Sequence, residues 1–253
     1  MIQLKNAQEL AKMRRACQIS AEALKLGGRS IEAGMTTADL DKIIYDYIKR
    51  HGARPNFKGL YGFPGTACIS INDEVIHGLP SHSRQIRPGD IVSIDTGAAI
   101  EGFNGDNACT FPCGKVDIEA QRLMDVTKES LHRGIAAAVA GNRVGDIGHA
   151  VQSYVEENGF SVVRSFVGHG VGKELHEDPE VPNYGHAGHG VRLVNGMTIA
   201  IEPMVNQKHH SVKTLSDGWT VVTADGGLAA HFEHSIAILP GGPEILTIGW
   251  EEP

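Results

Sequence analysis

Cysteine is scarce in this chain of 253 residues, and no two cysteines form a C-x-x-C pair. The four cysteines are irregularly spaced, at Cys17, Cys68, Cys109 and Cys113. Sparse, irregular cysteines are typical of free thiols in a reducing compartment and argue against a disulfide framework. We therefore expect a cytoplasmic protein.

Long hydrophobic runs and blocks of basic residues are also missing. No run approaches the ~18 apolar residues of a membrane span, and the polar start lacks the apolar core of a signal peptide. The formal net charge is −7, which does not indicate a nucleic-acid surface. The hydrophobic content of 41% is ordinary for a globular protein. The composition predicts one domain over residues 1–253 that binds neither membranes nor nucleic acid.

An order of elements repeats along the chain with a shift of 107 residues. Two helix patterns, the first from Asn6 to Gly27-Gly28, precede β-rich runs, and the same order returns from residue 117 onward. Under this shift GDIVSID (89–95) lies over GMTIAIE (196–202), so that Asp95 matches Glu202. The pattern predicts an α+β fold of two similar helix–helix–sheet halves, about 1–115 and 116–253, with a site between them.

The first half carries two aspartates on an expected hairpin. If the chain turns at Ile100-Glu101, Asp95 lies directly opposite Asp106. Because Asp95 follows the apolar run Ile-Val-Ser-Ile, it reads as part of a buried strand. Solvated surface acids are the usual alternative for such residues.

The second half presents a similar pair of acids. A turn at Asp217-Gly218 sets Glu202 opposite Glu233, with bulges expected near 206–210 and 224–227. Buried carboxylates need a counter-charge, so the two hairpins predict a cation site. Four carboxylates suffice for two ions about 3.5–4 Å apart. With His169 as a nitrogen ligand, the site suits Co, Mn, Fe or Zn.

The stretch GHGVGKELHEDP (168–179) has an alternative interpretation as a phosphate loop. Lys173 is followed by Glu174 rather than by Ser or Thr, and Val167 stands where the first glycine of the motif belongs. We expect instead that the glycines allow a close approach of the backbone. Loop histidines, namely His186, His189, His209 and His210, are expected to be solvated.

Five stretches together resemble the bacterial type I methionine aminopeptidases, which have the pita-bread (creatinase/aminopeptidase) fold around a curved antiparallel sheet. They are CISINDEVIHGLP (68–80), IDTGAAIEGFNGD (94–106), GHGVGKELHEDP (168–179), MTIAIEPMVN (197–206) and DGWTVVTADGGLAAHFEH (217–234). The resemblance covers nearly the whole chain. It implies two divalent ions held by Asp95, Asp106, His169, Glu202 and Glu233, with Asp106 and Glu233 bridging them.

The same resemblance implies roles in removing the N-terminal methionine of nascent polypeptides, preferentially before a small second residue. Glu202 would move the proton to the leaving amine, while His176 and His77 would contact the substrate at the carbonyl and the scissile nitrogen. The methionine pocket would include Phe63, Cys68 and Trp219. Two apolar residues, Phe57 and Leu60, stand where the best-known bacterial members carry cysteine and tyrosine.

Two other functions remain open at this stage. A proline-specific dipeptidase or aminopeptidase of the same fold shares all five ligands, although such enzymes usually carry a further N-terminal domain. A non-catalytic binding relative would have lost ligands that this chain keeps. The type II methionine enzymes carry a helical insertion between the last two ligands, whereas here only 31 positions separate Glu202 from Glu233. The resemblance also implies a monomer and leaves ribosome association open.

Overall fold

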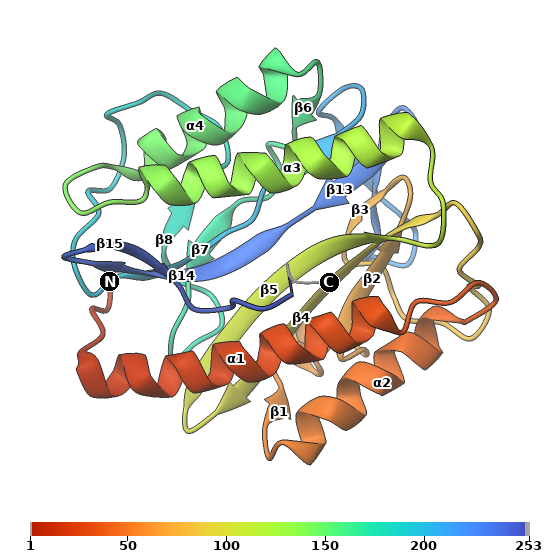
Figure 1. Cartoon of the computed structure of the whole chain (residues 1–253), viewed down its shortest axis with the longest axis horizontal. Helices are drawn as coiled ribbons and strands as arrows, with labels where there is room; N and C mark the ends of the chain where they lie inside the picture. Colours follow the sequence, from red (N-terminus) through yellow and green to blue (C-terminus); the bar gives the residue numbers. More distant parts are fainter. Residues whose placement is uncertain (1, 251–253) are drawn as a thin grey trace.

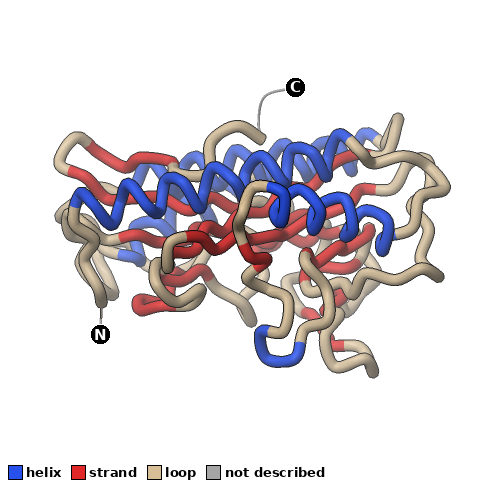
Figure 2. Tube along the Cα trace, turned by 90° about the horizontal axis from the view of Figure 1, so that it is seen from below, coloured by secondary structure: helices blue, strands red, loops and turns tan. Residues whose placement is uncertain are grey.

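The computed structural model describes residues 2–250, and its helices pack on one face of curved antiparallel sheets (Figure 1). The helices are α1 (Ala7–Arg29), α2 (Thr37–Arg50), α3 (Ile118–Ala137) and α4 (Val144–Glu157), with a short 3-10 helix, η1 (Leu60–Gly62). In Figure 2 the helices lie on one side of the strands, while η1 projects from the other side. No helix within residues 2–250 is long and apolar enough to cross a membrane.

The largest sheet joins strands from both halves of the chain. Its order is β1 (Arg54–Pro55), β4 (Ile91–Ile100), β5 (Phe103–Pro112), β14 (Glu233–Leu239), β9 (Thr198–Ile201), β7 (Gly168–Gly170) and β8 (Glu177–Val181), with β2 (Ala67–Ile71) beside β4 and β15 (Gly242–Ile245) beside β14. Two small sheets have the orders β13 (Ala229–His231), β10 (Met204–Asn206), β6 (Ser161–Val162) and β11 (Val212–Thr214), β12 (Val221–Thr223), β3 (Glu74–Ile76).

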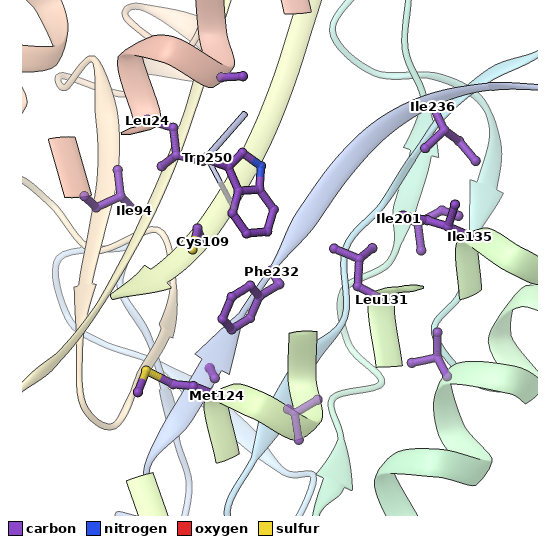
Figure 3. Packing of buried hydrophobic residues seen from close by; sticks show 14 of the residues in the cluster. Leu24, Ile94, Cys109, Met124, Leu131, Ile135, Ile201, Phe232, Ile236 and Trp250 are labelled. Carbon is purple, nitrogen blue, oxygen red and sulfur yellow. The ribbon is translucent and has the colours of Figure 1, made fainter. Parts of the chain in front are cut away.

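The core fills the space between the helices and the large sheet (Figure 3). Leu24 of α1 and Ile94 of β4 are fully buried there, as are Leu131 of α3 and Ile201 of β9. Successive side chains of a strand point to opposite faces. Because Ile94 points to the helices, its neighbour Asp95 points to the open face of the sheet.

Helix α1 begins as expected and ends later than expected. Asn6 Oδ1 accepts hydrogen bonds from the backbone N–H groups of Gln8 and Glu9, and Glu9 Oε2 accepts one from Asn6 N, which completes a capping box. The predicted end at Gly27-Gly28 is wrong, since the helix continues to Arg29. A Cβ on Gly28 would lie 2.3 Å from the Phe111 ring, so this glycine serves helix–sheet contact rather than termination.

The predicted register of the first hairpin is wrong by two residues. Strands β4 and β5 meet through Ile100 and Phe103, and the two turn residues, Glu101 and Gly102, have φ values of 54° and 80°. Positive φ at both positions is the requirement of a type I′ turn. Asp95 therefore pairs with Ala108, and Asp106 is its diagonal neighbour. A two-residue shift keeps both aspartates on the same face.

The predicted register of the second hairpin is correct. Ile201 pairs with His234 and Met204 with His231, and the same register returns in β11 and β12, where Thr214 pairs with Val221. The segments 207–211 and 224–228 between these strands have equal lengths, so they leave the register unchanged. At the turn, Asp217 Oδ1 accepts hydrogen bonds from the backbone N–H groups of Trp219 and Thr220.

Backbone hydrogen bonds of the first half recur in the second with the predicted shift of 107 residues. Gly34 N donates to Ile86 O, and Gly141 N donates to Leu193 O. The isolated bridge between Thr36 and Gln85 likewise corresponds to the one between Arg143 and Arg192. These correspondences support the two-halved organisation, which stays a prediction.

Gly105→Ala should destabilise the fold, because its Cβ would lie 2.5 Å from the backbone of Cys17 in α1. We expect a loss of about 1–3 kcal/mol of unfolding free energy, typical of overpacking, measured by urea denaturation. Gly241→Ala is the matched control, since nothing lies within 4 Å of its added Cβ. Equal stability of the two variants would contradict close packing of α1 on β5.

Candidate active site

One cavity of about 650 Å³ brings together every residue that the sequence predicted for the site. Its lining includes the five predicted metal ligands, Asp95, Asp106, His169, Glu202 and Glu233, and the five predicted substrate contacts, Phe63, Cys68, His77, His176 and Trp219. Five of these residues lie on strands β2, β4, β5, β7 and β14, and the other five lie in loops beside the strands. The cavity lies on the face of the sheet away from the helices.

The carboxylates form a buried acidic cluster. Asp106 and Glu233 are only 3% and 2% exposed, while Asp95 and Glu202 keep partial exposure to the cavity. Three carboxylate oxygens, Asp95 Oδ1, Asp106 Oδ1 and Glu233 Oε1, are buried with no hydrogen-bond partner. Buried, unpartnered carboxylate oxygens are costly, and they are the ligand atoms that a divalent cation requires. The donor set therefore fits a metal site.

Burial raises the pKa of each of these carboxyl groups. For Asp106 the pKa rises to about 7. The pKa values of Asp95, Glu202 and Glu233 rise well above their ordinary values. Burial is the larger cause, and repulsion by neighbouring carboxylates is the smaller one. Without a cation, the cluster thus holds protons that carboxyl groups in water would have lost.

His169 presents a ring nitrogen to this cluster. Its Nδ1 lies 2.8 Å from the Gly170 carbonyl oxygen, which fixes Nδ1 as the protonated nitrogen and leaves the Nε2 lone pair free. Nε2 lies 3.7 Å from Asp106 Oδ2 and 3.5 Å from Glu202 Oε1. Ligand atoms of Asp106, His169 and Glu233 all lie within 4.8 Å of one another, so this trio can hold one ion. Burial lowers the pKa of His169 to about 4, so the ring is neutral near pH 7.

The other two predicted histidines line the cavity beside the cluster. The ring centroid of His176 lies 4.5 Å from that of His169. His77, whose pKa burial lowers to about 4, has a φ of 60°, which is uncommon for a residue other than glycine. Strained backbone of this kind concentrates at functional sites. Both rings thus lie where they can contact a molecule bound at the acidic cluster.

An apolar pocket adjoins the histidines. Phe63 and Trp219 meet edge to face with centroids 5.2 Å apart, and Cys68 packs in the same cluster. The two residues that depart from the best-known bacterial pattern, Phe57 and Leu60, also belong to this cluster. The pocket therefore stays apolar despite the substitutions and suits an unbranched hydrophobic side chain.

The glycine loop that carries His169 and His176 is held close to its neighbours. An added Cβ would lie 2.3 Å from the Ala200 carbonyl oxygen at Gly168 and 2.2 Å from that of Asp178 at Gly170. The predicted role of these glycines, a close approach of the backbone, agrees with this packing.

Two polar side chains that do not line the cavity, Lys5 and Asn104, hold the same loop in place. The buried Lys5 Nζ donates to Glu177, next to His176, and Asn104 Nδ2 donates to the carbonyl oxygens of Gly172 and Lys173. Lys173, which has no place in the predicted site, pairs with Glu9 of α1 at 3.2 Å. The loop is thereby tied to both α1 and the β4–β5 turn.

The remaining histidines include exposed loop residues and one buried residue beside the site that was not predicted from the sequence. His186, His189 and His209 are exposed, as expected, whereas His210 is half-buried. His231, by contrast, is 2% exposed and its Nε2 lies 3.9 Å from Glu202 Oε2. Its position two residues before Glu233, in a run that reads as extended chain, was the signal that would have found it.

Comparison with known proteins decides the family. The model of metallopeptidase family M24 matches residues 11–240. The chain belongs to metallopeptidase family M24. A methionine aminopeptidase of Clostridium perfringens is 55% identical over 248 residues, which cover 98% of this chain and 99% of that protein. Members of the family are metallopeptidases, in agreement with the cluster of carboxylates and histidine in the cavity.

Solved structures confirm the predicted fold class. The crystal structure of a methionine aminopeptidase from Thermotoga maritima superposes with a TM-score of 0.96 at 45% identity and covers 98% of this chain and 99% of that one. A prolidase from Pyrococcus furiosus has a TM-score of 0.79 at 22% identity, and the match covers 97% of this M24 chain but 65% of the prolidase. At that identity the likeness shows the shared pita-bread fold alone.

Metal binding should release protons, because the carboxyl groups bind protons more tightly in the metal-free site than in water. Below pH 7 Asp106 is largely protonated, whereas His169 is already neutral. Titration calorimetry with Mn²⁺ at pH 6, in buffers of different ionisation enthalpy, should show net proton release. The apparent affinity should rise up to about tenfold per pH unit for each proton released. An affinity that stays constant between pH 6 and pH 8 would contradict the raised pKa values.

Proposed function

We propose that this M24 chain is a metal-dependent aminopeptidase that removes the N-terminal methionine from peptides and nascent proteins, preferentially when the second residue is small. One observation carries the proposal: a single cavity joins an acidic cluster able to hold metal to an apolar pocket lined by Phe63, Cys68 and Trp219. The end-to-end similarity to a methionine aminopeptidase at 55% identity supports the same assignment.

The proposed metal site holds two divalent ions. Its ligands would be Asp95, Asp106, His169, Glu202 and Glu233. Three buried carboxylate oxygens without partners, together with the free Nε2 of His169, support this set. When bound, the ions would supply an activated water and would polarise the first peptide carbonyl of the substrate.

The side chains of the chain itself would then handle protons and position the substrate. Glu202 accepts a proton at a carboxylate oxygen and delivers it to the leaving amine. His176, whose pKa burial lowers, is a neutral ring that donates an N–H to the substrate carbonyl oxygen as charge develops there. His77, which lines the same cavity, would lie near the scissile nitrogen. The apolar pocket holds the thioether and excludes water from it.

The proposed setting is the cytosol, where new polypeptide N-termini are made. Four free cysteines, all buried, support a reducing compartment. Nascent chains are the substrates that this activity requires. A monomer, with or without ribosome association, belongs to the same proposal.

Substrate choice separates this proposal from a proline-specific peptidase. The Mn²⁺-loaded protein should release methionine from Met-Ala-Ser and should leave Ala-Pro intact, as followed by chromatography of the products. Met-Leu-Ser is the matched peptide for the second position, and we expect it to be cleaved at least about tenfold more slowly because bulk there crowds the acidic cluster. Cleavage of Ala-Pro without release of methionine would overturn the proposal.

Glu202→Gln tests the proton-transfer role. We expect turnover of Met-Ala-Ser to fall by about 10²–10⁴-fold, the range for loss of general acid–base catalysis. Because Glu202 is also a proposed ligand, bound Mn²⁺ is measured in the same samples. Glu174→Gln is the matched control, since Glu174 is exposed and does not line the cavity. Wild-type turnover in the Glu202 variant would show that another group moves the proton.

A further inference from the structure

His231 is a buried imidazole beside the acidic cluster that belongs to none of the proposed ligand or substrate contacts. It ends strand β13 and is 2% exposed. Its Nε2 has no hydrogen-bond partner, and the nearest carboxylate oxygen that it faces is Glu202 Oε2, at 3.9 Å. A buried polar atom without a partner is costly, so this nitrogen calls for a hydrogen-bond partner within the site.

The backbone of His231 is fixed from both sides by one hydroxyl group. His231 N donates to Thr110 Oγ1 at 2.9 Å, and Thr110 Oγ1 donates to His231 O at 2.9 Å. Ser93 Oγ lies 2.8 Å from the same Thr110 oxygen and is therefore its second donor. These contacts, all on buried residues, anchor the backbone at the end of β13 to β5.

The strand register gives His231 a defined place in the site. In the first half, Asp95 pairs with Ala108, and Asp106 lies two residues before Ala108. In the second half, the register of Ile201 with His234 continues to Glu202 and Glu233. His231 lies two residues before Glu233. His231 therefore has the same position relative to Glu202 that Asp106 has relative to Asp95: each is a diagonal neighbour across the strand pair. This position places the His231 side chain on the face that carries the acidic cluster.

The chemistry of the pair fixes which atom donates. An ionised carboxylate offers only lone pairs, so the nitrogen facing Glu202 Oε2 must carry a proton for the contact to be attractive. The other oxygen, Glu202 Oε1, already faces His169 Nε2 at 3.5 Å. Glu202 thus has one oxygen toward His231 and one toward the proposed metal centre. A movement of about 1 Å brings Nε2 to hydrogen-bond distance, within ordinary side-chain motion.

We propose that His231 is a positioning residue for catalysis, whose Nε2–H donates to Glu202 Oε2 and keeps Oε1 directed at the metal centre. The proposal rests on the proposed function, because it assigns a task to the carboxylate that handles the proton. His231 fixes the rotamer of the Glu202 carboxylate before the reaction begins. The ordering of that side chain then adds less to the free-energy barrier. His231 itself need not touch substrate or metal.

The test compares His231→Leu with His231→Gln. Glutamine keeps an N–H donor at nearly the same reach, whereas leucine keeps volume without a donor. We expect the leucine variant to lose about 10–100-fold in kcat on Met-Ala-Ser, as for other residues that orient metal ligands, with KM changed less than about threefold. The glutamine variant should stay within about threefold of the wild type. Met204→Leu, which replaces the residue paired with His231, is the packing control and should stay near wild type.

A second readout does not depend on any peptide. The visible absorption spectrum of the Co²⁺-loaded protein reports on the carboxylates around the ion. The spectrum of the glutamine variant should superimpose on that of the wild type, and the spectrum of the leucine variant should be shifted. Because Nε2 has no hydrogen-bond partner in the structure, the leucine variant should unfold thermally at no lower temperature than the wild type when both are prepared without metal.

Failure of the positioning role and failure of the proposed function would give different results. An unchanged spectrum and unchanged kcat in His231→Leu would overturn the positioning role. Loss of one bound ion per chain in that variant, measured by Co²⁺ titration, would also overturn it and make His231 a ligand. Absence of methionine release by the wild type would overturn the proposed function alone, since the spectral comparison of the three proteins still decides whether His231 orients Glu202.

Discussion

Mutual repulsion among four carboxylates in one cavity is the constraint on which the site depends. Asp106 and Glu233 are almost fully buried, and three carboxylate oxygens of the cluster have no partner. No cationic side chain lines this cavity among residues 2–250 apart from histidines whose pKa values burial lowers. Protons or divalent cations must therefore offset the charge.

The scaffold brings these charges together from both halves of the chain. Strands β5 and β14 pair at the centre of the large sheet, with Glu233 opposite Ala108. Helices cover one face of this sheet and bury its apolar side chains, so that the polar residues of the same strands share the other face (Figures 1 and 2). The loop carrying His169 approaches closely because glycines at 168 and 170 leave room for neighbouring carbonyl groups.

Much of the site could be predicted because successive side chains of a strand alternate between the two faces of a sheet. A register error of two residues therefore leaves each side chain on its correct face. Asp95 and Asp106 are diagonal rather than opposed, yet they remain in one cluster. The error arose at the turn, where the chain reverses at Glu101-Gly102, one position later than expected. The end of α1 was missed for a similar reason: a glycine pair is a stop signal locally, but here it faces Phe111 and Ile44 across a tight packing contact.

The sequence by itself determined the family and the residue types available to the site, and it predicted the repeat of 107 residues, since these depend on residue identity and spacing. Only the tertiary structure decided which buried groups meet. His231 lies beside Glu202 because β13 is anchored to β5 through Thr110, a contact between residues 121 positions apart. The spacing of two residues from Glu233 places His231 on the face that carries the acidic cluster, but it does not give the distance between His231 and Glu202, because that distance depends on how the strands pack in the whole sheet.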